Sequence, residues 1–397
     1  MGFLSNRIER LSDSQTLMMT QKCRELKSKG IDVINLSIGE TDFFTPGEVK
    51  EAAKTAIDQN YSFYSPVSGY DDLKQAICKK LKENSMLNYL PEQVVVSNGA
   101  KQTLANIIMC LVNHGDEVII PVPYWVSYIE LVKLADGKPV ELYSSIDHDF
   151  KITPGELDKI ITPKTKAIFF NSPSNPTGSV YKYEELKAIA AVLAKYPHVF
   201  IISDEIYEHI IFEGKHETLA QFEEIRERVI VVNGVSKGYA MTGWRIGFMA
   251  GPKWLAKACI KLQGQTTSGA CSVSQRAALA ALNSGGEFIN DMQTTFKRRR
   301  DLILKHMDEI PGLKHTIPQG AFYVFPNISY YIGKSDGERK ICNDDDLTYY
   351  LLDKAFVAVV PGNAFGDPQC IRISYATSDE NLVKAMVRIK EALGKLK

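Results

Sequence analysis

Short apolar runs alternate with helix-like patterns through the central part of the chain. Predicted strands lie at 94–97, 117–121, 139–143, 167–171, 200–204 and 229–232. Apolar residues at helical spacing predict intervening helices at 71–84, 100–112, 124–135, 183–196 and 252–264. Such alternation is typical of β-α-β units, so it predicts an α/β fold whose mainly parallel sheet is covered by helices on both faces. Function is then expected at the carboxyl ends of the strands.

The two ends of the chain have a different pattern. Before the alternation, the sequence predicts a helix at 18–29, a strand at 31–38 and a helix at 46–60. After it come a long amphipathic helix at 287–310, strands at 320–326, 357–360 and 370–374, and a helix at 347–354. This change predicts a second, smaller α+β domain. We expect residues 1–44 to be an N-terminal segment of the small domain, 45–285 the large domain, and 286–397 the small C-terminal domain.

Composition narrows the class of protein. The 397 residues are 45% hydrophobic and 24% charged, with a formal net charge of +0, which argues against nucleic acid as a partner. The one dense basic run, 297–300, is interpreted as the solvated face of the long helix. No apolar stretch reaches the length of a membrane span, and the amino terminus does not resemble a leader, so we expect a cytoplasmic protein without a membrane partner.

Cysteine and histidine residues indicate neither disulfides nor a metal. The seven cysteines are scattered without a CxxC pair, which fits reduced thiols. The seven histidines form no HExxH motif, and we predict no metal site.

One lysine stands out from the others. Lys237 follows the apolar run 229–232, between Ser236 and Gly238, where a buried strand ends. A single lysine is ordinarily a solvated surface charge. An amine in a partly dry pocket, however, is more easily neutral and can condense with an aldehyde to a Schiff base. Trp244 and Arg245 nearby supply an apolar wall and a planar cation suited to phosphate.

Other polar residues follow other strands of the predicted sheet. Gly99 precedes a helix whose free N–H groups suit a phosphate, although such glycines also occur without a ligand. Trp125 can lie flat on a ring or pack in the core. Asn175 lies in the rigid segment NSPSNPTG, and Asp204 ends an apolar strand, with Tyr207 three residues further on. A carboxylate in that position requires a partner, because its desolvation costs several kcal/mol.

Together these groups match the requirements of pyridoxal 5′-phosphate. There is no GxGxxG and no GxxxxGK[ST] motif that would indicate a nucleotide instead. Lys237 could form the imine, Arg245 could hold the phosphate, and Asp204 could keep the pyridine nitrogen protonated. At about 4 Å, such an ion pair is worth roughly 4 kcal/mol at an effective dielectric near 20, against roughly 1 in water.

Motifs along nearly the whole chain resemble those of class I, fold-type I aminotransferases, and in particular the thermophile-type bacterial aspartate aminotransferases. These motifs are IxLSIGExDF at 34–43, YSPVSG at 64–69, SNGAKQ at 97–102, PVPYWVSY at 121–128, NSPSNPTG at 171–178, SDEIYE at 203–208, NGVSKGYAMTGWRIG at 233–247, GAFYVFP at 320–326, VAVVPGNAFG at 357–366 and IRISYATS at 371–378. The resemblance implies a large domain with a seven-stranded sheet plus a small α+β domain, and a homodimer.

The resemblance also implies roles around the cofactor. Lys237 would be the Schiff-base lysine and the proton-transferring base. Asp204 would pair with the pyridinium nitrogen, and Tyr207 and Asn175 would bond the phenolic oxygen. Trp125 would stack on the ring. The resemblance implies that the backbone groups of Gly99, Ala100 and Lys101, together with Ser236 and Arg245, hold the phosphate, with Tyr64 reaching across from the partner subunit.

Substrate contacts are implied as well. Arg372 would bind the α-carboxylate with its bidentate fork, beside the backbone of Gly39, with Trp125 and Asn175 also at the substrate. Aspartate aminotransferases of enteric bacteria and animals bind the side-chain carboxylate with a partner-subunit arginine, which has no match around 265–274. Thermophile-type members use a lysine at the position of Lys101, whose alternative interpretation is a solvated lysine at the start of a helix.

The implied reaction is ping-pong transfer of the amino group from L-aspartate to 2-oxoglutarate, giving oxaloacetate and L-glutamate. Alternatives on the same fold are an aromatic, prephenate or kynurenine aminotransferase and a carbon–sulfur lyase. An aminotransferase-like binding module of a regulator is a further alternative, but it would require a fused DNA-binding domain.

Overall fold

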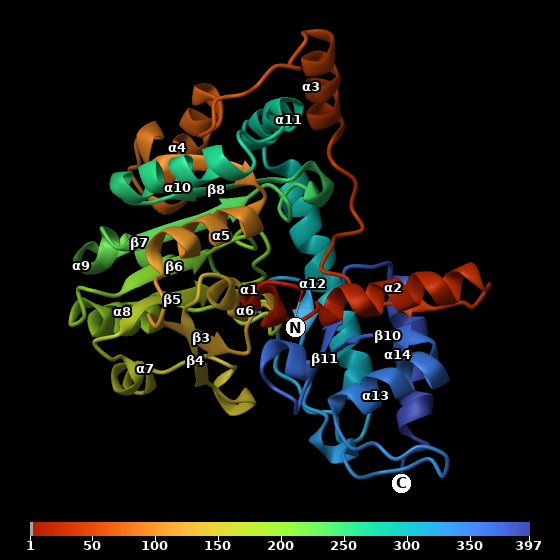
Figure 1. Cartoon of the computed structure of the whole chain (residues 1–397). Coiled ribbons are helices and arrows are strands. Elements are labelled where there is room, and N and C mark those ends of the chain that lie inside the picture. The colour runs from red at the N-terminus through yellow and green to blue at the C-terminus, as the bar shows by residue number, and fades with distance from the viewer. Residues whose placement is uncertain (1–2) are drawn as a thin grey trace.

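A seven-stranded sheet forms the centre of the larger part of the molecule (Figure 1). The computed structural model describes residues 3–397. In the sheet the strands follow the order β2-β8-β7-β6-β5-β3-β4. Their bounds are β2 Val94–Asn98, β3 Glu117–Val122, β4 Lys138–Tyr143, β5 Thr165–Asn171, β6 Phe200–Asp204, β7 Val229–Gly234 and β8 Ile246–Ala250. Neighbouring strands are parallel except at β8, which runs antiparallel to both β2 and β7. The predicted α/β fold class is confirmed.

Helices cover both faces of this sheet, as the alternation predicted. One face carries α3 (Gly47–Asp58), α4 (Asp71–Ser85), α7 (Pro154–Ile160), α8 (Tyr183–Ala194), α9 (Glu223–Arg226) and α11 (Ser272–Leu282). The other carries α5 (Ala100–Leu111), α6 (Ser127–Leu134) and α10 (Lys253–Thr266). Side chains alternate between the faces along each strand, so Val94 and Val96 pack on the first set and Val95 on the second.

A smaller part packs around α12 (Glu287–Met307), drawn in teal to blue in Figure 1. Its other elements are α13 (Asp344–Tyr350) with a π-helical turn at Leu351–Ala355, α14 (Asp379–Leu393), and the short strands β9 (Tyr323–Val324), β10 (Val357–Ala358), β11 (Val360–Pro361) and β12 (Ile371–Ser374). Strand β1 (Ile34–Asn35), which follows α1 (Asn6–Glu9) and α2 (Gln15–Ser28), pairs with β10. Leu36 lies in the same core, although the domain boundaries remain a prediction.

Three predicted strands are shorter in the structure. The extended segment predicted at 31–38 pairs regularly only over β1, and further along, the carbonyls of Ser37 and Gly39 accept hydrogen bonds from Arg372 and Lys237. The strand predicted at 357–360 is split, since β10 pairs with β1 whereas β11 pairs with β12. The strand predicted at 320–326 pairs regularly only over β9.

The interpretation of the basic run 297–300 as a solvated face is wrong for two of its residues. Lys297 and Arg298 are exposed, but Arg299 and Arg300 are buried. Arg299 donates two hydrogen bonds of 2.7 Å to the carboxylate of Asp42, and Arg300 donates to a backbone carbonyl. A bidentate carboxylate offsets the desolvation of the guanidinium, and it links α12 to the segment that follows β1.

Among residues 3–397, none of the helices combines the length and the apolar character that a membrane crossing needs.

Candidate active site

Asp204 lies at the carboxyl end of β6, where the sequence predicted a buried carboxylate. It is 4% exposed and aligned with Asn171 at the end of β5. Its carboxylate accepts a hydrogen bond of 2.6 Å from the hydroxyl of Tyr128, and the amide of Asn171 donates to its carbonyl. Burial raises the pKa of Asp204 to about 6, against the opposing effect of the Tyr128 hydrogen bond. The hydroxyl of Tyr128 thus fixes Oδ2 of this carboxylate. The other oxygen, Oδ1, accepts only a weak hydrogen bond of 3.3 Å from the N–H of Ile206.

Tyr128 is a site residue that the sequence analysis missed. It comes from α6, is buried, and stacks on Phe169 with ring centroids 4.3 Å apart, while Trp125 contacts its ring edge to face at 5.5 Å. The signal was present in PVPYWVSY, which contains both Trp125 and Tyr128. A buried strand-end carboxylate requires a donor, and this motif contains the phenol that supplies it.

Lys237 follows β7, as predicted, and its side chain enters the same region. Its ammonium donates a hydrogen bond to the carbonyl of Gly39. Burial lowers the pKa of Lys237 to about 8, while the carboxylate of Glu40 raises it and Arg372 and Arg245 lower it further. The carboxylate of Asp204 raises this pKa as well. The four charged groups that act on this amine therefore come from four separate segments of the chain.

A tight backbone cradle forms where β2 meets β8. Gly99, at the N-cap of α5, has φ of 81°, and a Cβ there would lie 2.3 Å from Nη2 of Arg245. A Cβ on Gly247 would lie 2.2 Å from the N atom of Ala100. The guanidinium of Arg245 donates to the carbonyls of Asn98 and Thr242, at 3.2 and 2.9 Å. A helix N-terminus beside an arginine is a ready site for a phosphate.

A buried arginine closes the opposite side of the site. Arg372, on β12, is 2% exposed and donates to Asn175 at 3.0 Å and to the carbonyl of Ser37 at 2.6 Å. Its Nε has no partner among the described residues. The hydroxyl of Tyr323 lies 2.7 Å from the hydroxyl of Tyr207. A Cβ added to Gly39 would lie 2.8 Å from the same Tyr323 hydroxyl. The unpaired Nε is a donor for an anion such as a carboxylate.

Of the remaining predicted residues, Ser236 and Lys101 lie at the site, whereas Tyr64 does not. Ser236 is buried directly before Lys237. The ammonium of Lys101 lies 4.9 Å from the ring centre of Trp125, and partial burial together with Arg245 lowers its pKa. Tyr64 is 96% exposed, in a loop that lines a surface hollow with residues 269–272. Within one chain, therefore, the structure brings the predicted residues together except Tyr64. Ser37 and Tyr323 are further contacts that the sequence analysis missed.

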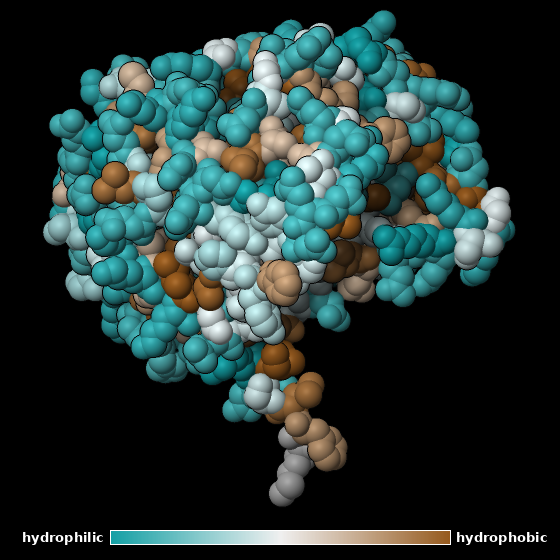
Figure 2. Space-filling model, turned by 90° about the horizontal axis from the view of Figure 1, so that it is seen from above, coloured by the Kyte–Doolittle hydropathy of each residue, from teal (hydrophilic) through white to brown (hydrophobic). Residues whose placement is uncertain are grey.

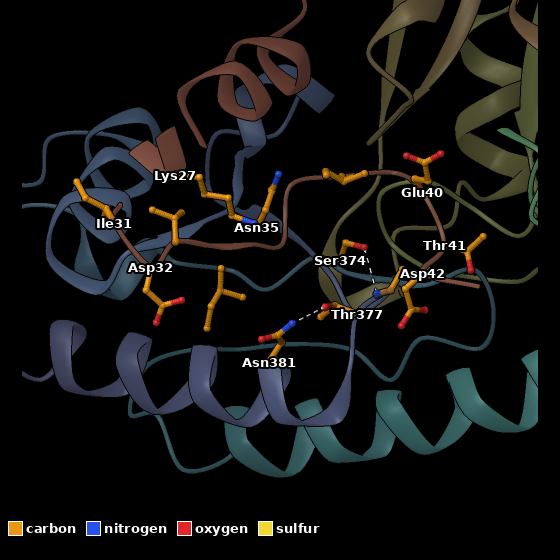
Figure 3. Close-up of a pocket in the computed structure, with 14 residues that line it drawn as sticks. Lys27, Ile31, Asp32, Asn35, Glu40, Thr41, Asp42, Ser374, Thr377 and Asn381 are labelled. Carbon is orange, nitrogen blue, oxygen red and sulfur yellow. Dashed lines mark hydrogen bonds between the residues drawn. The ribbon is translucent and has the colours of Figure 1, made fainter. Parts of the chain in front are cut away.

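A separate cavity of about 520 Å³ lies beside the segment that leads to Gly39 (Figure 3). Asn35 lines it from this segment, Glu40, Thr41 and Asp42 line it from the residues that follow Gly39, and Thr377 and Asn381 lie just before and within the first turn of α14. Figure 3 shows the segment crossing above α14 between these side chains. The residues that line the cavity do not include Lys237, Asp204 or Arg372, so the cavity is distinct from the site.

The assembled residues fit pyridoxal 5′-phosphate. They provide a buried amine of lowered pKa, a strand-end carboxylate, a cradle into which a Cβ would not fit, and a buried arginine with an unpaired donor. Fold and site together define an α/β enzyme that uses a lysine-bound aldehyde cofactor.

Comparison with known proteins identifies the family. The model of the aminotransferase class I and II family matches residues 31–389. The aspartate/prephenate aminotransferase of Cereibacter sphaeroides is 48% identical over 393 residues, covering 98% of both chains. The bifunctional aspartate aminotransferase and glutamate/aspartate-prephenate aminotransferase of Petunia hybrida is 47% identical over 99% of this chain and 83% of its own. The chain belongs to the aminotransferase class I and II family and is a pyridoxal phosphate-dependent transaminase.

Solved structures agree with this assignment. The aspartate aminotransferase of Rhizobium meliloti superimposes with a TM-score of 0.96 at 41% identity, covering 100% of both chains. The Thermus thermophilus aspartate aminotransferase with maleate gives a TM-score of 0.93 at 38% identity, covering 99% of this chain and 100% of its own. The predicted fold type and the predicted resemblance to thermophile-type aspartate aminotransferases are confirmed.

Proposed function

We propose that this enzyme transfers the amino group of L-aspartate to 2-oxoglutarate, giving oxaloacetate and L-glutamate in a ping-pong reaction. The observation that carries the proposal is the buried amine of Lys237, with its pKa lowered to about 8, bonded to Gly39 and acted on by the charges of Asp204 and Arg372. An amine with this pKa is about one-tenth neutral at pH 7, as a nucleophile and proton acceptor must be.

The chain's own residues divide the work of holding the cofactor. Lys237 would bind its aldehyde, Asp204 its ring nitrogen, and Tyr207 and Asn175 its phenolic oxygen. Trp125 would cover the ring face. The backbone groups of Gly99, Ala100 and Lys101, together with Ser236 and Arg245, would hold the phosphate. When bound, pyridoxal phosphate supplies an electron sink for the electron pair left at the substrate's α-carbon.

Substrate is oriented by fixed cations. Arg372, held by Asn175 and by the Ser37 carbonyl, binds the α-carboxylate through donors that include the unpaired Nε. Lys101, beside Trp125, binds the side-chain carboxylate. The amine of Lys237 would remove the proton from the substrate's α-carbon. The Thermus thermophilus structure contains maleate, which like aspartate is a four-carbon dicarboxylate, and this supports a site for two carboxylates.

The active enzyme is proposed to be a homodimer with a shared active site. Large apolar side chains between residues 44 and 64 are exposed, among them Phe44, Ile57, Phe63 and Tyr64. Figure 2 looks onto the end of the molecule where α3 and α11 lie, and shows apolar side chains interspersed among polar ones. A second chain covering this region would bury them and bring its Tyr64 to the phosphate.

A cytosolic location is supported by seven free cysteines.

A half-reaction screen tests the proposed reaction. Each amino acid is added to the cofactor-loaded enzyme without an oxoacid, and the visible band of the bound cofactor is followed. L-Aspartate and L-glutamate should both convert the band, and Lys237→Ala should neither show that band nor turn over. A wild-type enzyme that ignores both dicarboxylic amino acids overturns the proposed function.

Prephenate is a second candidate acceptor, because both curated relatives named above carry it in their names. The same screen run in reverse, with prephenate added to the aminated enzyme, distinguishes one oxoacid from the other. Release of pyruvate without an acceptor would instead indicate a carbon–sulfur lyase.

A further inference from the structure

A buried cluster of charges lies behind the turn that carries Asp204 and Tyr207. In this turn the N–H of Glu208 donates to the carbonyl of Glu205 at 2.9 Å, and the N–H of Ile210 donates to that of Tyr207 at 2.8 Å. Asp204 and Tyr207 contact Tyr128 and Tyr323 at the site. Glu205 and Glu208, only 2% and 7% exposed, have other partners, and the proposed function assigns them no role.

Each of these two carboxylates has its own polar partners. The ammonium of Lys80, from α4, pairs with Oε1 of Glu208, and both side chains are buried. Glu205 accepts bonds from Ser203 and Thr218, and its other oxygen lies 2.9 Å from Nε2 of His216. Burial opposes ionisation of Glu208, but Lys80, His209 and His216 outweigh it and lower its pKa to about 2. Burial also disfavours protonated His216, yet Glu205 outweighs that effect and raises its pKa.

A cation of the chain lies where this cluster could otherwise hold a metal ion. Glu205, Glu208 and His216 place ligand atoms within 4.8 Å of one another, a spacing that could hold an ion. The Lys80 ammonium, however, already bonds Glu208 at this point, and the chain itself thus supplies the cation. Glu208 is paired with Lys80, and Glu205 accepts from Ser203 and Thr218 and faces His216, so both buried carboxylates have partners.

His209 connects the cluster to the catalytic lysine. Its Nε2 lies 3.3 Å from the same Glu208 oxygen that Lys80 contacts. A Cβ on Gly238 would lie 2.5 Å from Cδ2 of His209, so the ring packs directly against the residue that follows Lys237. Burial lowers the pKa of His209 to about 4, and the ring is therefore neutral at physiological pH.

We infer that Lys80 is a positioning residue: by pairing with Glu208 it fixes the turn that presents Asp204 and Tyr207 to the cofactor. The residue after Glu208 in this turn, His209, packs against Gly238 beside Lys237. Lys80 does not touch the site itself. The inference rests on the proposed roles of Asp204 and Tyr207, since they give the turn its function.

The test uses Lys80→Met, Glu208→Gln and the double variant, with Lys151→Met as matched control. Lys151 is also a buried lysine, paired with Glu185 at 3.0 Å and lying over Tyr181. Two quantities are measured: the pH midpoint of the bound cofactor's visible band, and the dissociation constant of pyridoxal phosphate from the apoenzyme. Thermal unfolding of the apoenzyme is recorded in parallel.

In Lys80→Met the midpoint should rise by about 0.5 to 1 pH unit and the cofactor should bind about 5- to 10-fold more weakly, the size expected when one hydrogen bond to the cofactor is misplaced. The double variant leaves no unpaired charge, so its thermal stability should largely recover while the midpoint stays shifted. Lys151→Met should keep the wild-type midpoint.

A purely structural role for Lys80 would restore the midpoint together with the stability. A wild-type midpoint in the double variant, or in a folded Lys80→Met, therefore overturns the inference. If Lys80→Met does not fold, the double variant alone decides. The proposed function fails separately, if the wild-type band is absent or survives in Lys237→Ala.

Discussion

Lys237 is held in the folded chain at a cost in stability. Its pKa is lowered by burial from an ordinary value of 10.5 to about 8, which means that the folded state disfavours its protonated form. At 1.36 kcal/mol per pKa unit, the cost at pH 7 is of the order of 3 kcal/mol. The folded chain would thus be more stable with a non-ionisable side chain in the environment that makes this amine reactive.

Lys237→Met should therefore stabilise the cofactor-free protein at pH 7, by about 1 to 3 kcal/mol. The unfolded chain binds more protons than the folded one between pH 8 and 10.5, so wild-type stability rises with pH there and the gap to the variant should narrow. Urea unfolding of both apoproteins at pH 7 and pH 10 measures this. A gap that is absent at pH 7, or that widens with pH, contradicts the lowered pKa.

Lys101 is the residue on which the choice of aspartate is proposed to depend. If its ammonium binds the side-chain carboxylate, Lys101→Ser should lower kcat/KM for aspartate by about 2 to 3 kcal/mol in transition-state free energy. L-Alanine lacks that carboxylate and serves as the control donor, whose kcat/KM should stay near wild type. Equal losses for both donors would mean that Lys101 acts only on the cofactor.

Single residues could be predicted from the sequence where a motif fixes them, and not where only packing does. Lys237 and Asp204 were predicted from their positions at strand ends and Arg372 from its motif, and the structure brings the three together as expected. Tyr128 and Tyr323 were missed because each reads as an ordinary core aromatic. Their roles are seen only in the structure, because their partners are distant in sequence. Tyr128 donates to Asp204, and Tyr323 bonds Tyr207.

At the scale of elements, the phosphate cradle depends on the junction between β2 and β8. Gly99→Ala should weaken cofactor binding at least 10-fold, since the added methyl would displace the guanidinium of Arg245 from Asn98. Gly115→Ala is the matched control: Gly115 has φ of 84° and no atom within 4 Å of a built Cβ. Both variants bear the strain of a positive φ, of about 1 kcal/mol.

Spectroscopic titration of the two apoenzymes with pyridoxal phosphate separates the clash from the strain. Gly115→Ala should lose stability but bind the cofactor as wild type does. Similar affinities in both variants would show that the cradle does not depend on this close approach.

The sequence predicted elements well where apolar runs were isolated between helices. It missed β8, because Ile246–Ala250 follows a glycine-rich turn without a helix before it, and its pairing with β2 joins segments about 150 residues apart. That antiparallel strand is the one that brings Arg245 to Gly99. The burial of Arg299 was missed for the same reason, because its partner Asp42 lies 257 residues away.

At the scale of the whole molecule, Tyr64 is the predicted site residue that a single chain does not bring to the site. Its side chain is 96% exposed, and the preceding residue, Phe63, is exposed as well. A tyrosine and a phenylalanine side by side on a surface loop are typical of a protein interface. The shared active site proposed above would account for both the exposure and the motif.

Subunit mixing tests this arrangement directly. Lys237→Ala chains, which are expected to be inactive, and Tyr64→Ala chains, which are expected to be weakly active, are unfolded, mixed in equal amounts and refolded together. If each site takes Lys237 from one chain and Tyr64 from the other, half of the dimers are mixed and carry one intact site of two, so activity should recover to about a quarter of wild type. If both residues act within one chain, every site keeps a defect and mixing adds nothing. Wild-type chains refolded with Lys237→Ala control for refolding yield, and size-exclusion chromatography of each mixture confirms that dimers have formed.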